Sequence, residues 1–144
     1  MLARFILILS SLGFLNASYL TYFFIQKTFF NNPYSICDIS NTLSCSSVIT
    51  SPYAQFFGLP GCTIALIVYP VLIFLAYRAL CNKKPQIPFF WLSVFSGMGL
   101  VMNYILIYNE YAFIKAYCIL CIFCSFVITA IFASSITGFL KSVR

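Results

Sequence analysis

Cysteine is the residue type whose number and spacing in this chain indicate a specific chemistry. The 144 residues include seven cysteines, no histidine and only two acidic residues, Asp38 and Glu110. Histidine and carboxylate side chains supply most general bases and many metal ligands in proteins. Their scarcity therefore leaves thiol chemistry as the main reactive capacity of the sequence.

Cys118 and Cys121 form a CxxC motif, which places two sulfur atoms about one turn apart on the same face of a helix. At that spacing the two thiols can close a disulfide. The motif lies where we expect a helix to begin, and the partial positive charge of a helix N-terminus stabilises a thiolate. Lys115 adds a positive charge one turn earlier. We therefore interpret the motif as a reactive dithiol.

Cys37 and Cys45 form a second candidate pair in a polar stretch of Ser, Asn and Thr residues with little helical or strand pattern. Such a stretch is typical of a loop that can move. A mobile dithiol there can meet a soluble partner on one side and the CxxC motif on the other. It would pass electrons between them by thiol–disulfide exchange.

Three alternative interpretations of the cysteines stay open at this point. The loop pair can be a static disulfide, and the CxxC motif can be two small packing residues in a helix. A four-cysteine zinc site is less consistent with one half in a loop and the other in a helix turn, so we expect no metal. The remaining three cysteines, Cys62, Cys81 and Cys124, fit packing roles best.

The composition determines which elements must position these cysteines. Hydrophobic residues make up 62% of the chain and charged residues 7%, far below the usual quarter, so a soluble surface could not be built. Four apolar runs, at about 5–25, 58–77, 88–108 and 116–137, are each long enough to cross a bilayer as a helix. We predict an all-α membrane protein, a four-transmembrane-helix bundle formed by residues 1–144 as a single domain.

The basic residues predict the orientation of these spans. If the chain crosses the membrane at each of the four runs, the segments between them lie on alternate sides. One side would then carry six basic residues, Arg4, Arg78, Lys83, Lys84, Lys141 and Arg144, and the other only Lys27 and Lys115. The positive-inside rule then places both termini in the cytoplasm and the 26–57 loop in an extracytoplasmic, disulfide-permissive compartment. The first run can alternatively be a cleaved signal peptide, but its length and the charge bias favour a retained span. No basic stripe predicts a nucleic-acid partner.

A redox-active CxxC motif in a membrane needs an electron acceptor that reaches it through lipid. Aromatic residues near the expected depth of Cys121 would let a ring system approach its sulfur: Phe56, Phe57, Tyr117, Phe123 and Phe126. Aromatic residues at that depth are also ordinary members of an interfacial belt. The acceptor site is therefore the least specified part of the sequence.

The two cysteine pairs and the segment between them resemble the vitamin K epoxide reductase family, particularly its bacterial and archaeal members. The resemblance rests on Cys37 and Cys45, on residues 46–59 (SSVITSPYAQFFGL) and on the CILC of residues 118–121. Its specific features are seven residues between the loop cysteines, a Ser six residues after the second, FGL before the second span, and CxxC at the start of the fourth.

This resemblance implies a set of catalytic roles. Cys37 and Cys45 would be the loop relay, Cys118 would receive electrons from Cys45 through a mixed disulfide, and Cys121 would face a quinone. Ser51 matches the family's loop Ser near the active site.

Phe57 and Ser125 are the other expected quinone contacts. The quinone is expected to belong to the ubiquinone, menaquinone or phylloquinone class. Two departures bear on the substrate. Ser125 stands where vertebrate enzymes carry a Tyr, and Ala54 where they place an Asn that holds the naphthoquinone. Epoxide reduction is therefore not the expected activity.

The resemblance implies a dithiol:quinone oxidoreductase of the prokaryotic inner membrane that reoxidises a separate DsbA-like thioredoxin-fold protein and so drives disulfide formation. The closest alternative is a vitamin K quinone or epoxide reductase proper. A DsbB-type protein would carry its CxxC in the first outer loop, the reverse of this order. A non-catalytic membrane scaffold with structural disulfides is the alternative from another class.

Overall fold

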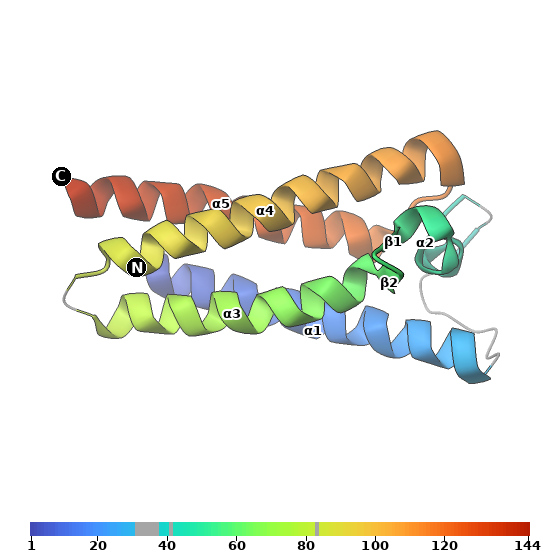
Figure 1. The fold of residues 1–144 in the computed structure, drawn as a ribbon, viewed down its shortest axis with the longest axis horizontal. Helices are drawn as coiled ribbons and strands as arrows, with labels where there is room; N and C mark the ends of the chain where they lie inside the picture. The colour runs from blue at the N-terminus through green and yellow to red at the C-terminus, as the bar shows by residue number, and fades with distance from the viewer. Residues whose placement is uncertain (31–37, 41, 83) are drawn as a thin grey trace.

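The protein is a bundle of four long helices. The computed structural model describes residues 1–30, 38–40, 42–82 and 84–144. The long helices are α1 (Leu2–Phe30), α3 (Gly61–Cys81), α4 (Gln86–Asn109) and α5 (Ile119–Val143). Figure 1 shows both chain termini and the turn between α3 and α4 at one end of the bundle, and the short elements that follow α1 at the other.

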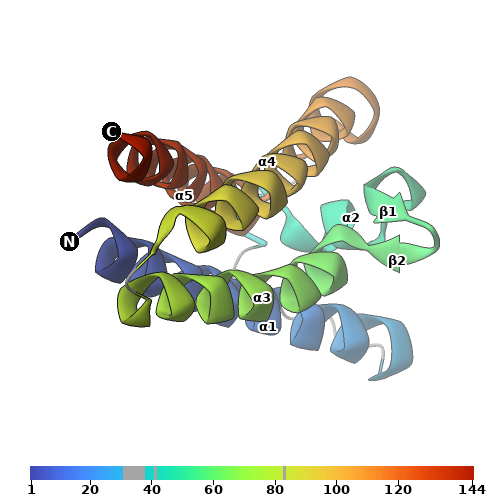
Figure 2. The ribbon, with the colours of Figure 1, turned by 60° about the vertical axis from the view of Figure 1, so that its left-hand side comes forward.

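The four helices close into a ring of neighbours. Helix α1 packs against α3 and α5, and α4 packs against the same two helices from the other side (Figures 1 and 2). All four are long and apolar enough to cross a membrane. The predicted all-α membrane fold with four spans is therefore confirmed, although each helix extends beyond the apolar run that predicted it.

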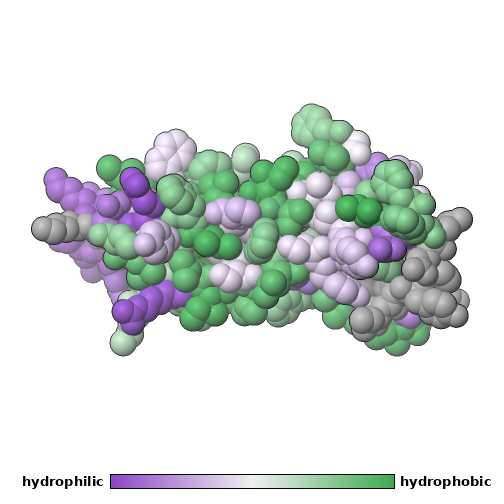
Figure 3. All heavy atoms as spheres, turned by 90° about the horizontal axis from the view of Figure 1, so that it is seen from below, coloured by the Kyte–Doolittle hydropathy of each residue, from purple (hydrophilic) through white to green (hydrophobic). Residues whose placement is uncertain are grey.

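Apolar side chains cover both the inside and the outside of the bundle. Ile6 is fully buried in the core, for example, whereas Ile8 and Leu12 lie on the outer surface. Figure 3 shows a hydrophobic band along the middle of one face, with hydrophilic residues gathered at the end that holds the termini. An outer surface of this kind suits lipid as its solvent. Which membrane side each end faces stays a prediction.

Small residues let the helices approach closely. A Cβ added to Gly138 on α5 would lie 2.6 Å from a ring carbon of Phe89 on α4. Gly13 on α1 similarly leaves room for the ring of Tyr69 on α3. Glycine at such contacts is typical of helix packing in membranes, where close van der Waals contact replaces the hydrophobic effect as the main attraction.

The segment between α1 and α3 is more regular than its sequence predicts. It contains α2 (Cys45–Thr50), the 3₁₀ turn η1 (Pro52–Ala54), and a small hairpin of β1 (Gln55–Phe56) and β2 (Leu59–Pro60). The expectation of little helical or strand pattern around Cys45 was wrong. A six-residue helix is too short to produce a detectable period, and its stability comes from caps and packing instead of propensity.

The hairpin turn is formed by Phe57 and Gly58, whose φ angles are 54° and 80°. Two positive φ values in a two-residue loop match the twist of a tight hairpin. Glycine adopts this conformation without cost, but a phenylalanine does so only under strain. The Phe57 side chain is 98% exposed.

A π-helical turn, η2 (Glu110–Ile114), ends α4 and prepares the reversal into α5. Lys115 follows with a φ of 54°, and its backbone N–H donates to the carbonyl oxygen of Glu110 at 2.8 Å. The chain can therefore turn sharply and start α5 beside the loop elements. Ala116 is buried at this reversal.

Candidate active site

A short backbone contact brings the segment between α1 and α3 to the start of α5. Leu43 forms a parallel bridge with Tyr117, and the Tyr117 N–H donates to the carbonyl oxygen of Thr42 at 2.8 Å. Cys45 follows Leu43 by two residues, and Cys118 follows Tyr117 directly. This contact therefore fixes the register in which the two cysteines meet.

Helix α2 holds Cys45 at its first position. Ser44 is the N-cap, and its hydroxyl oxygen accepts a hydrogen bond from the Ser47 N–H at 3.3 Å. The Ser44 hydroxyl also donates to Asp38 Oδ1 at 2.8 Å, and the Ser46 N–H donates to the same oxygen at 3.1 Å. A capped N-terminus with a carboxylate beside it stabilises a helix that is otherwise too short to persist.

The charge of Asp38 is favoured by this arrangement. Burial alone would raise the pKa of the carboxyl, but hydrogen bonds from the Ser46 amide and from the Ser46 and Ser44 hydroxyls, with the charge of Lys27, outweigh it. The pKa of Asp38 is lowered below its ordinary value as a result. The carboxylate therefore stays ionised and available to the α2 N-terminus at neutral pH.

Cys118 is the N-cap of α5 and contacts both other site cysteines that the structure describes. Its sulfur accepts a hydrogen bond from the Cys121 N–H at 3.3 Å, and its thiol donates to the Cys45 sulfur at 3.1 Å. Cys45 and Cys118 are both 0% exposed. Cys45 is disulfide-bonded, whereas Cys118 and Cys121 are free thiols. A thiol in contact with a disulfide sulfur is the arrangement from which thiol–disulfide exchange proceeds.

The sequence predicted four catalytic cysteines, and three of them lie in one apolar cluster. Cys45 and Cys118 are buried in it, and Cys121 packs against it half-buried. Residues of α1 and α2, such as Leu20, Phe23 and Val48, complete the cluster. The predicted start of the fourth helix at the CxxC motif is confirmed. Cys37 lies outside the described residues.

The three predicted quinone contacts lie in different places. The Ser51 hydroxyl accepts a hydrogen bond from the Tyr53 N–H at 3.3 Å and caps η1. Phe57 projects from the hairpin turn into the surroundings. The Ser125 hydroxyl lies 2.9 Å from the Cys121 carbonyl oxygen and 2.7 Å from Asn103 Oδ1, to both of which it can donate. Their roles toward a quinone stay predictions, and Ser125 is the one adjoining both the CxxC turn and α4.

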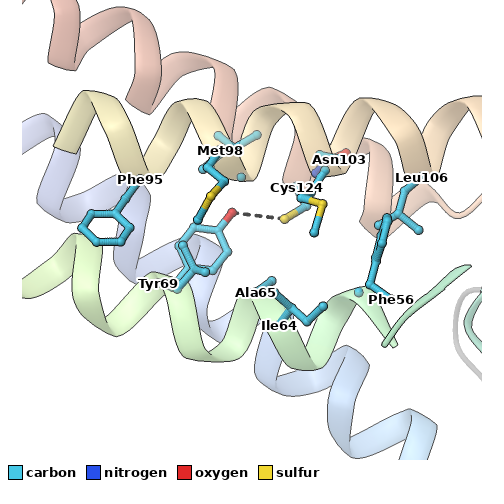
Figure 4. Close-up of a pocket in the computed structure, with 14 residues that line it drawn as sticks. Phe56, Ile64, Ala65, Tyr69, Phe95, Met98, Asn103, Leu106 and Cys124 are labelled. Atoms are coloured by element: carbon cyan, nitrogen blue, oxygen red, sulfur yellow. Dashed lines mark hydrogen bonds between the residues drawn. The ribbon is translucent and has the colours of Figure 1, made fainter. Parts of the chain in front are cut away.

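A cavity of about 130 Å³ opens between α3, α4 and α5. Figure 4 shows Tyr69 and Phe95 toward one end of it and Phe56 with Leu106 toward the other. Cys124 also lines the cavity, and its sulfur lies 3.1 Å from the Tyr69 hydroxyl, in hydrogen-bonding contact. Cys124 therefore does more than fill space, because it presents a polar group to the cavity.

The cavity is the size of one small apolar ring. An apolar protein cavity of roughly 150 Å³ binds benzene, so this one has room for about one six-membered ring. Its wall is almost entirely apolar, with the Tyr69 hydroxyl and the Asn103 amide as hydrogen-bonding groups. The Asn103 carbonyl oxygen already accepts from Ser125, which leaves the amide NH₂ as a donor. A mostly apolar cavity with a few polar groups is the usual form of a small-molecule site.

Sequence reasoning assigned no functional role to Glu110. Its side chain is 1% exposed and its Oε2 accepts a hydrogen bond from the Cys118 N–H at 3.4 Å. A carboxylate at the end of an apolar run is costly and therefore a signal in itself. Asn103 gave the same kind of signal, as a carboxamide within a predicted span. Among the described residues, no cluster of three potential ligands could hold a metal ion.

Comparison with known proteins adds one match that covers almost the whole chain. The family model described as "Vitamin K epoxide reductase family" matches residues 4–136. The matched region contains α2, the hairpin, the CxxC motif and the cavity. No curated protein matches the chain.

Proposed function

The chain belongs to the vitamin K epoxide reductase family, and on this premise we propose that it is a dithiol:quinone oxidoreductase that reoxidises a thioredoxin-fold partner. The family connects the chain with quinone-linked thiol oxidation in general. The observation that carries the finer proposal is the 3.1 Å contact between the sulfurs of Cys118 and Cys45. Two buried sulfurs at this separation, one in a disulfide and one a free thiol, are placed for thiol–disulfide exchange.

The proposed relay starts with the loop pair reduced and the CxxC pair oxidised. The Cys45 thiolate attacks Cys118, so the Cys45–Cys118 bond forms, the Cys118–Cys121 bond breaks, and Cys121 leaves with the electron pair. Cys37 then attacks Cys45 and releases Cys118 as a thiol. The loop pair is now a disulfide and the CxxC pair a dithiol. Disulfide-bonded Cys45 beside free thiols at Cys118 and Cys121 is the distribution expected at this stage.

The partner is expected to be a separate DsbA-like protein, and it would undergo thiol–disulfide exchange with Cys37. Cys45 is fully buried, so a cysteine of another protein cannot approach its sulfur in this arrangement. The other member of the predicted pair therefore has to receive the partner's electrons. Tyr53 and Phe113 are exposed, their rings stack at 4.8 Å, and we expect the partner to meet this surface.

The quinone ring is expected in the cavity between α3, α4 and α5. A quinone supplies an acceptor for two electrons and two protons there. Tyr69 and Asn103 would orient its carbonyl oxygens, and the apolar wall would exclude water. Ser125 joins the cavity to the CxxC turn, because its hydroxyl contacts both Asn103 and the Cys121 carbonyl. Cavity and dithiol therefore adjoin through a single residue.

The test uses purified protein in detergent with a reduced thioredoxin-fold oxidase and a soluble quinone, followed by quinone absorbance. Wild type should consume quinone, whereas Cys118→Ala and Cys121→Ala should each abolish turnover. Cys121→Ala should also accumulate a Cys45–Cys118 mixed disulfide, identified by mass spectrometry after acid quenching and alkylation. Cys81→Ala, which changes an exposed cysteine at the far end of the bundle, is the matched control and should turn over normally.

A second variant tests the ring site. Asn103→Ala should raise the KM for quinone about tenfold, because one hydrogen bond contributes about 1–1.5 kcal/mol. It should leave mixed-disulfide formation unchanged. Cysteine-independent quinone loss, or no mixed disulfide under any redox condition, would contradict the proposed function.

A further inference from the structure

Glu110 is a buried carboxyl group beside the reactive dithiol, and the relay described above gives it no role. Oε2 is held by the Cys118 N–H at 3.4 Å. Oε1 is buried and has no hydrogen-bond partner among the described residues. The Cys121 N–H in turn donates to the Cys118 sulfur at 3.3 Å, so the carboxyl group and Cys121 both adjoin Cys118. Oε2 is thus anchored by a hydrogen bond, and Oε1 is available to accept a proton.

Burying an acceptor without a partner costs about 1–3 kcal/mol or more, so such a group is expected to serve a purpose. The backbone of Glu110 is also fixed, since its carbonyl oxygen accepts the Lys115 N–H at 2.8 Å and closes the π-helical turn. The carboxyl group therefore has little freedom to turn away from the CxxC motif.

Oxidation of a dithiol releases two protons along with two electrons. Histidine is absent from the chain, and the only other carboxylate, Asp38, is engaged at the N-terminus of α2. A buried dithiol without a nearby base would have to release its protons into an apolar cluster, at a large cost. Glu110 is the group positioned to avoid that cost.

Resting on the proposed function, we infer that Glu110 is the proton acceptor and donor of the CxxC pair, acting through Oε1 on Cys121. When the dithiol is oxidised, the carboxylate takes the Cys121 proton and the Cys118–Cys121 bond forms. The electron pair and the Cys118 proton go to the quinone, which takes its second proton from water. When Cys45 later attacks Cys118, that bond breaks and Cys121 leaves as a thiolate. The neutral carboxylic acid then returns the proton to it.

A purely structural role is the competing explanation, because the bond from Oε2 to the Cys118 N–H also caps the start of α5. Glu110→Gln separates the two explanations. The amide oxygen can keep this hydrogen bond in a side chain of the same shape, whereas an amide cannot accept a proton. Glu110→Asp provides the reverse case, a base on a shorter side chain.

The elements packed around Glu110 carry other titratable groups. Helix α2 carries Cys45, which is disulfide-bonded, and η1 carries Tyr53, which is exposed. Tyr104 and Tyr108 on α4 are exposed on the outer surface. Cys121 remains as the thiol on which the carboxylate acts in the proposed proton transfer.

The experiment measures two rates in the same variants, in a background with Cys62 and Cys81 changed to Ala. Single-turnover quinone reduction by the pre-reduced protein should fall roughly hundredfold in Glu110→Gln, the usual contribution of a positioned acid–base group. Glu110→Asp should recover at least part of that rate. Alkylation of Cys121 by iodoacetamide at fixed pH should instead become about threefold to tenfold faster in Glu110→Gln, since loss of the carboxylate charge favours the thiolate.

Opposite changes in the two rates, with unchanged thermal unfolding, are the result expected of a proton acceptor. Unchanged rates of both kinds, or a parallel loss of both with a lowered Tm, would overturn the inference and leave Glu110 as a structural cap. Failure of the proposed function gives a different pattern. In that case wild type reduces no quinone, while the alkylation comparison still reports whether the carboxylate acts on Cys121.

Discussion

The contact between Cys45 and Cys118 depends on a six-residue helix, and its N-cap can be removed by one substitution. Ser44→Ala deletes the hydroxyl that accepts the Ser47 N–H and donates to Asp38. Loss of an N-cap costs about 1 kcal/mol. Loss of the charge-assisted hydrogen bond to Asp38 costs about 1 kcal/mol more.

The expected destabilisation of α2 is therefore about 2 kcal/mol, and it acts on local opening because the rest of the bundle is untouched. At 1.4 kcal/mol per factor of ten, the fraction of molecules with α2 open rises roughly thirtyfold. Amide hydrogen exchange is proportional to this fraction when opening and closing are fast, so it provides a direct measurement. Exchange in a peptide covering residues 42–54 should accelerate by that factor.

The matched control is Ser142→Ala at the other end of the bundle, where the hydroxyl donates to the Phe139 carbonyl oxygen. It should leave exchange in residues 42–54 unchanged. In the Cys121→Ala background, Ser44→Ala should also slow the appearance of the Cys45–Cys118 mixed disulfide. Acceleration of exchange by less than about threefold would refute the view that the cap holds α2, and with it Cys45, in place.

Three further predictions concern packing, the hairpin turn and pH. Gly138→Ala should lower the stability of the bundle by about 1–3 kcal/mol, measured by thermal unfolding in detergent, because the added methyl group collides with the Phe89 ring. Phe57→Gly should raise stability by roughly 1 kcal/mol, because it relieves a positive φ at an exposed side chain. It should also leave the quinone KM unchanged, whereas a large rise in KM would instead establish a ring contact by Phe57. Asp38 has a lowered pKa in the folded protein, so its contribution to stability is complete above the ordinary value of about 3.9 and is lost as pH falls below it. Wild-type Tm should therefore drop as pH falls below about 4, and Asp38→Asn should lose most of that drop.

The sequence was sufficient for the fold class because the bilayer imposes simple requirements. A run of about twenty apolar residues has to satisfy its backbone internally and so forms a helix, whatever its neighbours are. The four runs therefore predicted α1, α3, α4 and α5 with errors only at their ends. The sequence also indicated that Cys118 and Cys121 open the last helix.

Local structure in the outer loop was not predictable in the same way. Helix α2 has only six residues, and the contacts that stabilise it come from Asp38 before it and from packing against α1. The turn at Phe57 and Gly58 places a phenylalanine where propensity alone would exclude one. Tertiary contacts outweigh local preference at α2, whereas at Phe57 the two-residue loop of the hairpin imposes the positive φ.

The sequence by itself determined which residues can react: two cysteine pairs in a chain of four apolar spans. Only the tertiary structure decided which of them meet, because Cys45 and Cys118 are 73 residues apart and are joined through a single backbone bridge between Leu43 and Tyr117. The same is true of Glu110, whose position under the CxxC motif follows from a π-helical turn and a left-handed Lys115. Residue type and spacing determine chemical capacity, whereas long-range contacts determine which groups lie within bonding distance of one another.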